Sequence, residues 1–272
     1  MANDDAVTYE ARGDIGVITL NRPDNRNSMT PEVLDCFAKA SWAAKSDANT
    51  RCVIVTGTGS CFSAGADFKS SLQREDETDD KGKRRSPDER SYAMYEPFLS
   101  LLDIDVPVIA ACQGHAVGGG FGLALVCDVR IVAKDAKYGA NFTAIGLSPG
   151  MAISYLLPRL VGVGRANEML LTGRLIKGDE AERIGLANRA VDAAEVMKEA
   201  EAMARAIADN APFAVKETKK AIYRGLTFNS VTAVKDAARA EAHVQAISVG
   251  MDDVREGTTA LLEKRKPTFT GK

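Results

Sequence analysis

The sequence predicts an α/β fold in which buried parallel strands alternate with covering helices, followed by a helical C-terminal region. Two observations support this fold class. In the first two thirds of the 272-residue chain, short apolar runs rich in Val and Ile alternate with segments of helical periodicity. Beyond about Met151 the pattern turns wholly helical. Alternation of this kind predicts right-handed crossovers, and therefore a parallel sheet.

The expected elements are distributed along the whole chain. They are paired strands at 7–11 and 15–20, a helix over 30–45, a strand at 52–56, a helix over 92–102, strands at 106–111 and 129–133, and helices over 164–172, 196–207, 212–224, 230–249 and 252–264. Thr30 is an N-cap candidate because Pro31 follows it at the first helical position. The run CVIVT at 52–56 is typical of a strand buried on both faces.

One uncharged stretch, residues 106–127, is 22 positions long and therefore long enough to span a bilayer as a helix. Its content predicts otherwise, because it contains Pro107 and five glycines that would weaken a helix. We expect a buried strand at 106–111, a tight loop at 112–120 and a buried helix from Phe121 to Cys127. The N-terminus lacks the apolar segment of a signal peptide, so no membrane association is expected.

A strongly charged segment at 69–91 has an acidic half followed by a basic half and little to bury. A solvated surface loop is the expected structure, and a role in substrate gating is the alternative.

Charge and cysteine content limit the function classes. The 35 Lys and Arg residues nearly balance 37 Asp and Glu residues, so nucleic acid and anionic membranes are not expected partners. The five cysteines are widely spaced without a CxxC pair, which predicts reduced thiols in a cytoplasmic protein. With two histidines far apart, no metal site is predicted, and His115 is more typical of packing than of catalysis.

Two glycine-bearing loops, at 52–68 and 108–122, each follow a buried apolar strand. Glycine allows close approach of the backbone, and N–H groups left free where a helix begins attract negative charge. Either loop alone is more simply a tight turn, but two together favour an anion-stabilising pair of donors. The glycines do not match a phosphate loop, since Gly120 and Phe121 replace the required Lys and Ser/Thr. The GxGxxG pattern of dinucleotide-binding proteins is also absent, because Phe62 stands where its third glycine is required.

A serine hydrolase is a third possibility, because 146–150 fits GxSxG around Ser148 and His243 lies downstream. Pro149 argues against it. In that fold the residue after the nucleophile donates its N–H to the oxyanion hole, and proline has none.

Several segments together resemble the enoyl-CoA hydratase/isomerase, or crotonase, family. They are NRPDNRNSM at 21–29, CFSAGADFK at 61–69, the run from Pro107 to Ala133, IGLSPG at 145–150, the run from Leu171 to Val191 and EKRKPTFTGK at 263–272. The resemblance implies a spiral of ββα units with an acyl-CoA site over 1–200, and a helical region over 201–272 used for trimerisation, as a homotrimer or dimer of trimers. It implies no cofactor, because CoA is part of the substrate.

Matched residue by residue, the resemblance implies that the thioester carbonyl lies between the backbone N–H groups of Ala66 and Gly119. It also implies that the substrate contacts Ala64, Ala66, Asp67, Phe68, Lys69 and Gly119. Two donors suit an enolate, whose negative charge gathers on the thioester oxygen.

The sequence departs from the family where hydratases carry two glutamates. Gly122 and Phe142 stand at those positions, facing the acyl pocket, and neither transfers a proton. Hydratase chemistry and single-glutamate isomerase chemistry at these positions are therefore not expected. Glu96, or an acid from the charged segment, is a candidate replacement, whereas Asp67 and Asp128 are expected to be structural. The remaining alternatives are an enzyme with a non-standard proton shuttle, a catalytically silent acyl-CoA-binding protein, and the Ser148 hydrolase.

Overall fold

The structure, a computed structural model, describes residues 5–67, 85–225 and 230–268. In this part of the chain a six-stranded sheet has the order β1-β2-β3-β5-β7-β10. Its strands are β1 (Val7–Arg12), β2 (Ile15–Leu20), β3 (Cys52–Gly57), β5 (Val108–Cys112), β7 (Val129–Ala133) and β10 (Arg189–Val191). Only β1 and β2 pair antiparallel, and all other neighbours are parallel. The predicted α/β class is confirmed.

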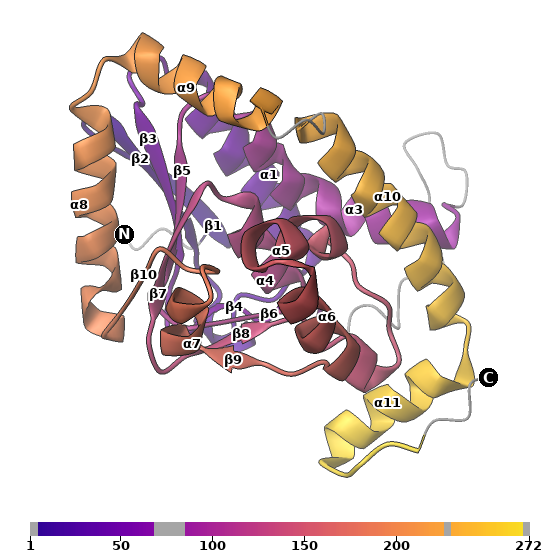
Figure 1. The fold of residues 1–272 in the computed structure, drawn as a ribbon. Coiled ribbons are helices and arrows are strands. Elements are labelled where there is room, and N and C mark those ends of the chain that lie inside the picture. The colour runs from indigo at the N-terminus through magenta and orange to yellow at the C-terminus, as the bar shows by residue number, and fades with distance from the viewer. Residues whose placement is uncertain (1–4, 68–84, 226–229, 269–272) are drawn as a thin grey trace.

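A second, four-stranded sheet lies beside the first (Figure 1). It consists of β4 (Cys61–Ser63), β6 (His115–Val117), β8 (Lys137–Gly139) and β9 (Ile176–Lys177). Each of β4, β6 and β8 directly follows a strand of the larger sheet, and the next helix comes after it. This repeat of two strands and a helix is the spiral of ββα units that the sequence predicted.

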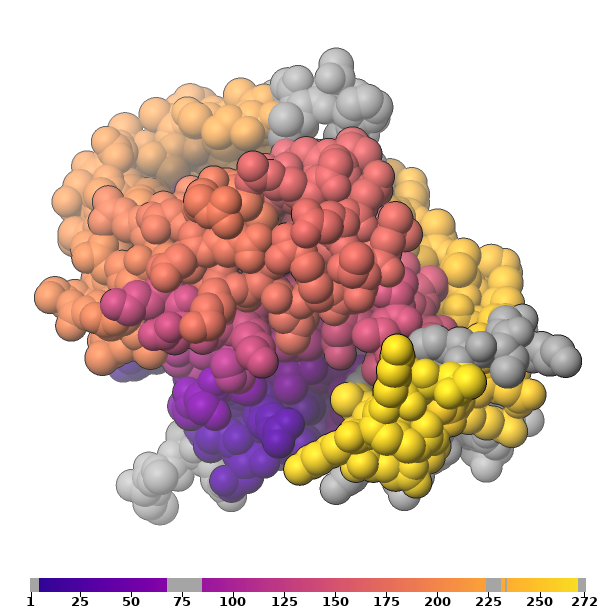
Figure 2. Space-filling view, turned by 60° about the horizontal axis from the view of Figure 1, so that its bottom comes forward, coloured from indigo at the N-terminus to yellow at the C-terminus, as the bar shows by residue number. Residues whose placement is uncertain are grey.

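Helices cover both faces of the larger sheet (Figure 1). In the described ranges the helices are α1 (Pro31–Ser46), α3 (Pro87–Leu99), α4 (Gly119–Val126), α5 (Ile153–Val161), α6 (Val163–Thr172), α7 (Gly178–Arg183), α8 (Val196–Ala208), α9 (Pro212–Gly225), α10 (Ser230–Val249) and α11 (Asp252–Glu263). α8 packs against β3, β5 and β7, whereas α1 packs against β1 and β2 on the other face, and α10 lies along α3. Short 3-10 turns occur at Pro23–Asn25, Ser100–Asp103, Thr143–Ile145 and Ala193–Glu195. Figure 2 shows α11 and residues 264–268, in yellow, as a lobe at the edge of the molecule.

Capping explains where the first helices begin. The Thr30 hydroxyl accepts from the Val33 N–H at 3.2 Å, as its sequence position predicted. α3 starts earlier than the predicted residue 92, because Ser86 and Glu89 form a capping box. Residues 68–84 of the predicted charged loop lie outside the described residues. From Pro87 onward the loop prediction is wrong, because the chain is helical there.

The uncharged stretch 106–127 is not one continuous helix, and none of the helices in the described ranges is long and apolar enough to span a membrane. It contains β5, β6 and α4. The predicted loop at 112–120 is wrong at β6, which pairs with β4 and β8. Helix α4 begins at Gly119 rather than Phe121, and a Cβ at Gly120 would overlap the Ser63 carbonyl oxygen.

Arg130 fixes the far end of α4. This side chain is 6% exposed, and its guanidinium donates to the carbonyls of Ala124, Cys127 and Leu186 at 3.3, 2.6 and 2.7 Å. Burial lowers its pKa. Cations near the last carbonyls of a helix interact favourably with its dipole, so Arg130 stabilises α4 in place.

The C-terminal third is mostly helical, but the expectation of a wholly helical pattern beyond Met151 is wrong at β9 and β10. These strands have two and three residues, which is too short for a periodic signal. The predicted division at residue 200 falls inside α8 and remains a prediction. All five cysteines are free thiols, as expected.

Candidate functional site

The two glycine-bearing loops meet beyond the carboxyl ends of β3 and β5. The Gln113 side chain connects them, because its Nε2 donates to the Cys61 carbonyl at 2.8 Å. A Cβ at Gly65, where φ is +79°, would lie 2.8 Å from the Gly119 nitrogen. Glycine at 65 therefore permits both the left-handed conformation and the contact between loops. In open α/β sheets, ligands bind at this end of the strands.

Each loop has a backbone N–H close to the place where the two loops contact each other, which we call the junction. Gly119 is the first residue of α4, where an N–H has no partner within its own helix. Ala66 pairs with Met29 in an isolated parallel bridge. Within the ranges that the structure describes, neither the Ala66 N–H nor the Gly119 N–H has a hydrogen-bond acceptor. Gly118, just before the second donor, is held by its own N–H, which donates to the Gly139 carbonyl at 3.0 Å.

The other predicted contact residues flank the first donor. The Ala64 N–H donates to the Arg26 carbonyl at 3.0 Å, which fixes the backbone before Gly65. Asp67 is half-buried and interacts with other groups of the protein. Phe68 and Lys69 lie outside the described residues.

Gly122 and Phe142 also lie beside the junction, in apolar surroundings. A Cβ at Gly122 would lie 2.5 Å from the Cβ of Met151, so the Met151 side chain occupies the space where a larger residue 122 would project. Phe142 is 8% exposed, and its ring faces Gly118, where a Cβ would lie 3.7 Å from the Phe142 Cζ. Neither position offers an acid or a base, and Met151 leaves no room for one at 122.

A family model described as enoyl-CoA hydratase/isomerase matches residues 10–272, nearly the whole chain. The chain belongs to the enoyl-CoA hydratase/isomerase family. It is 36% identical over 263 residues to a short-chain-enoyl-CoA hydratase of Clostridium acetobutylicum, covering 96% of this chain and 95% of that protein.

Solved structures agree over the same extent. A carnitinyl-CoA hydratase from Mycobacterium avium has a TM-score of 0.84 and 30% identity, covering 99% of this chain and 100% of that one. An enoyl-CoA hydratase/isomerase from Pseudoalteromonas atlantica T6c has a TM-score of 0.84 and 27% identity, covering 97% and 100%. The crotonase-like fold is therefore confirmed.

One candidate replacement for an acid or base that the sequence suggested lies on α3, next to a buried tyrosine. Glu96, a candidate from the sequence, is exposed on α3, whereas its neighbour Tyr95 is buried. The Tyr95 hydroxyl donates to Gln245 Oε1 on α10, and the Gln245 Nε2 donates to the Ser148 carbonyl at 3.0 Å. Burial strongly raises the pKa of Tyr95, so this phenol stays protonated.

Glu241, one turn before Gln245 on α10, is the buried carboxylate of this region, 8% exposed. Its Oε1 accepts from the Ser154 N–H at 2.9 Å and from the Ser154 hydroxyl, near the start of α5. Burial raises its pKa, and the hydrogen bonds from Ser154 oppose that shift. This arrangement is typical of a carboxylate that caps a helix. Sequence reasoning missed both Glu241 and Tyr95. Helical periodicity can indicate that such positions are buried, but it does not identify their hydrogen-bond partners.

The geometry around Ser148 argues against a hydrolase in this family member. The Ser148 hydroxyl is buried and has no hydrogen-bond partner among the described residues. His243 is exposed on α10. The other histidine, His115, accepts from the Lys137 N–H at 2.9 Å through its Nδ1, which joins β6 to β8. In the described part of the chain, no group of three or more His, Cys, Asp or Glu side chains is arranged to hold a metal.

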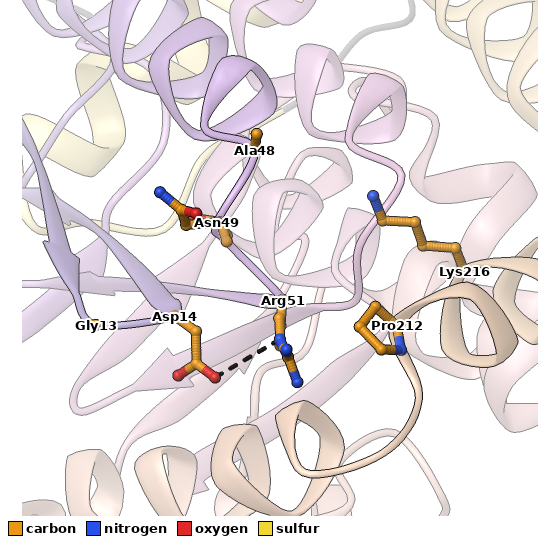
Figure 3. Close-up of a pocket in the computed structure, with 8 residues that line it drawn as sticks. Gly13, Asp14, Ala48, Asn49, Arg51, Pro212 and Lys216 are labelled. Atoms are coloured by element: carbon orange, nitrogen blue, oxygen red, sulfur yellow. Dashed lines mark ion pairs between the residues drawn. The ribbon is translucent and has the colours of Figure 1, made fainter.

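Two hollows on the described surface lie at the opposite, amino end of the large sheet. One is lined by Asp14, Arg51, Pro212 and Lys216 among others, and its Asp14–Arg51 ion pair spans 3.8 Å (Figure 3). The other lies between α9 and the start of β5 and β7. Neither includes Ala66 or Gly119, so neither is the site that the loops form.

Proposed function

We propose that this crotonase-family protein binds an acyl-CoA thioester with its carbonyl oxygen between the N–H groups of Ala66 and Gly119, and that these donors stabilise an enolate. The observation that carries the proposal is that two loops in contact each carry a backbone N–H that has no acceptor among the described residues. Donors aimed at developing negative charge need no reorganisation during the reaction, and each is typically worth about 10²–10³ in rate.

The remaining binding residues are those that the family resemblance implies. Ala64, Ala66, Asp67, Phe68 and Lys69 contact the CoA-bearing part of the substrate, whereas Gly122 and Phe142 line the acyl pocket. No cofactor is required beyond the CoA of the substrate itself. The protein works in the cytoplasm as a homotrimer or a dimer of trimers. Relatives whose names specify enoyl-CoA and carnitinyl-CoA support the choice of thioester.

The reaction itself differs from hydration by two glutamates. Each acid or base typically contributes about 10²–10⁴ in rate, and Gly122 and Phe142 supply neither. The proton shuttle therefore comes from a non-standard position. The second candidate function, a silent acyl-CoA-binding protein, is favoured by one observation: the Met151 side chain fills the space beside Gly122.

One experiment separates these functions. Calorimetric titration with a saturated acyl-CoA measures binding, and a panel of enoyl-CoA and other acyl-CoA esters measures turnover. We expect binding, some turnover, and hydration of enoyl-CoA at least about 10⁴-fold slower than by the clostridial relative, because two proton-transfer groups are missing. Binding without any turnover supports the silent protein. Absence of binding contradicts both.

A further inference from the structure

Residues 26–29 run parallel to residues 64–66 and form hydrogen bonds with them. The Ala64 N–H donates to the Arg26 carbonyl at 3.0 Å, and the Met29 N–H donates to the Gly65 carbonyl at 2.8 Å. Met29 is thus the bridge partner of Ala66, the residue that supplies the first proposed donor. The position of that donor depends on the backbone of Met29.

This segment is itself held rigidly by Asn27, which is fully buried and has a left-handed φ of +53°. Its Nδ2 donates to the carbonyls of Thr58 and Cys61 at 3.0 and 2.8 Å. The Ser63 hydroxyl donates to the Asn27 carbonyl at 2.8 Å and accepts from the Gly65 N–H at 3.3 Å. A strained conformation persists only where its surroundings over-determine it, so residues 26–29 form a fixed support.

The Met29 side chain reaches the second donor. It is 2% exposed, and a Cβ at Gly119 would overlap its Sδ and lie 3.3 Å from its Cε. The thioether is therefore packed against Gly119, the first residue of α4. One residue contacts both donor loops, the first through its backbone and the second through its side chain.

We infer that Met29 is a positioning residue that sets the spacing between the Ala66 and Gly119 N–H groups, an inference that rests on the proposed function. Hydrogen-bond donors of an oxyanion hole act over a narrow range of distances. A displacement of about 1 Å can cost about 10²-fold in rate. Removing the thioether leaves an empty space behind Gly119 into which α4 can shift, although both N–H groups remain.

The test compares Met29→Ala with Met29→Leu, which keeps most of the volume, and with Met169→Ala. Met169 is a matched control because it is 1% exposed but lies on α6, which packs mainly against α5 and the turn at Thr143–Ile145. The first readout is the infrared stretching frequency of a ¹³C-labelled thioester carbonyl in a bound saturated acyl-CoA. Donors that polarise the carbonyl lower this frequency.

We expect Met29→Ala to lose more than half of the wild-type shift, while Met29→Leu and Met169→Ala retain it. For any thioester that the wild type turns over, kcat of Met29→Ala falls by about tenfold or more with KM changed by less than about threefold, because the missing interaction acts on the transition state. If Met29→Ala does not fold, Met29→Val leaves the Sδ position empty with a smaller loss of volume, and the same results are expected.

The outcomes separate this inference from the proposed function. If wild-type protein binds acyl-CoA without any carbonyl shift, the oxyanion assignment itself is wrong. If the wild type gives the shift and Met29→Ala gives it equally, with kcat matching that of Met169→Ala, then Met29 does not position the donors.

Discussion

The two ends of the large sheet differ in whether their polar groups have hydrogen-bond partners. At the carboxyl end, the N–H groups of Ala66 and Gly119 have no acceptor among the described residues. At the amino end, Asp128 accepts from the Val108 N–H at 2.7 Å, from Lys219 Nζ at 2.8 Å and from the Tyr223 hydroxyl at 2.5 Å.

This difference is the one that we expect between the proposed ligand site and a structural anchor. Backbone N–H groups without a hydrogen-bond partner are uncommon in folded proteins. Among the described residues, the carboxyl end has two of them on loops that contact each other, which supports binding of an anionic or carbonyl oxygen there. The amino end saturates its carboxylate and so attaches α9 to the sheet. Changes at the first end should affect activity, and changes at the second should affect stability.

The largest expected effect is the loss of activity in Gly119→Pro, which removes one donor. Any thioester turnover should fall by about 10²–10³-fold or more, since one oxyanion donor is typically worth that much. Steady-state kinetics measure this loss. Gly119→Ala is the control, because it places the same Cβ against the Met29 Sδ but keeps the N–H. Unchanged turnover in Gly119→Pro would mean that the oxyanion donors lie elsewhere.

At the other end, Lys219→Met should destabilise the protein by about 3 kcal/mol, because it leaves Asp128 buried without its cation. The two side chains are 14% and 16% exposed, and Lys219 also donates to the carbonyls of Ile104 and Val106 at 3.1 and 2.9 Å. Chemical denaturation measures the change. Acyl-CoA affinity of the folded variant should match the wild type, and a large loss of affinity would contradict the separation of the two ends.

Sequence reasoning predicted the elements whose signals are local. Thr30 and Pro31 mark the start of α1, and the apolar runs of β3 and β5 were recognised as buried strands. It missed β6 and β8, because three-residue strands carry no periodic pattern and are stabilised by partners distant in the chain. The two glycine-bearing loops could also be predicted, because each directly follows one of these recognisable strands.

The groups that surround the donors were not predictable in this way. Met29 lies 90 positions before Gly119, and Met151 lies 29 positions after Gly122. Nothing local in the sequence distinguishes either methionine from an ordinary core residue. Only the fold places Met29 against the first residue of α4, Gly119, and Met151 against Gly122, one turn later in the same helix.

A smaller effect tests the packing at Gly122. Gly122→Ala should lower the free energy of unfolding by about 1–3 kcal/mol, the usual cost of overpacking, because the new Cβ meets the Met151 Cβ. Met151 has a left-handed φ of +60°, which glycine adopts without strain. In the double variant with Met151→Gly, the alanine should therefore cost much less. Equal costs in both backgrounds would contradict the contact, and a double-mutant cycle measures the difference.

The smallest expected effect is a pH dependence at Glu241. Burial raises the pKa of Glu241 above the ordinary 4.5. At pH values between 4.5 and this raised pKa, the folded protein therefore binds more protons than the unfolded chain. The contribution of Glu241 to stability therefore falls as pH rises through this window. Unfolding of wild type and Glu241→Gln, followed from about pH 4 to pH 8 at one protein concentration, should show that the difference between them changes in this direction. A difference that is constant with pH would mean that Glu241 is not shifted.

The buried positive charge of Arg130 raises the electrostatic potential at the junction from a distance. Its guanidinium lies at the last carbonyls of α4, an eight-residue helix about 12 Å long whose first N–H is the Gly119 donor. At an effective dielectric constant of about 20, one positive charge at that distance lowers the energy of a negative oxygen by about 1 kcal/mol. The charge of the neighbouring Asp128 is already balanced by Lys219. Since Arg130 is removed from solvent, salt screens this potential only weakly. An enolate at the junction would therefore be stabilised by a cation that never touches it.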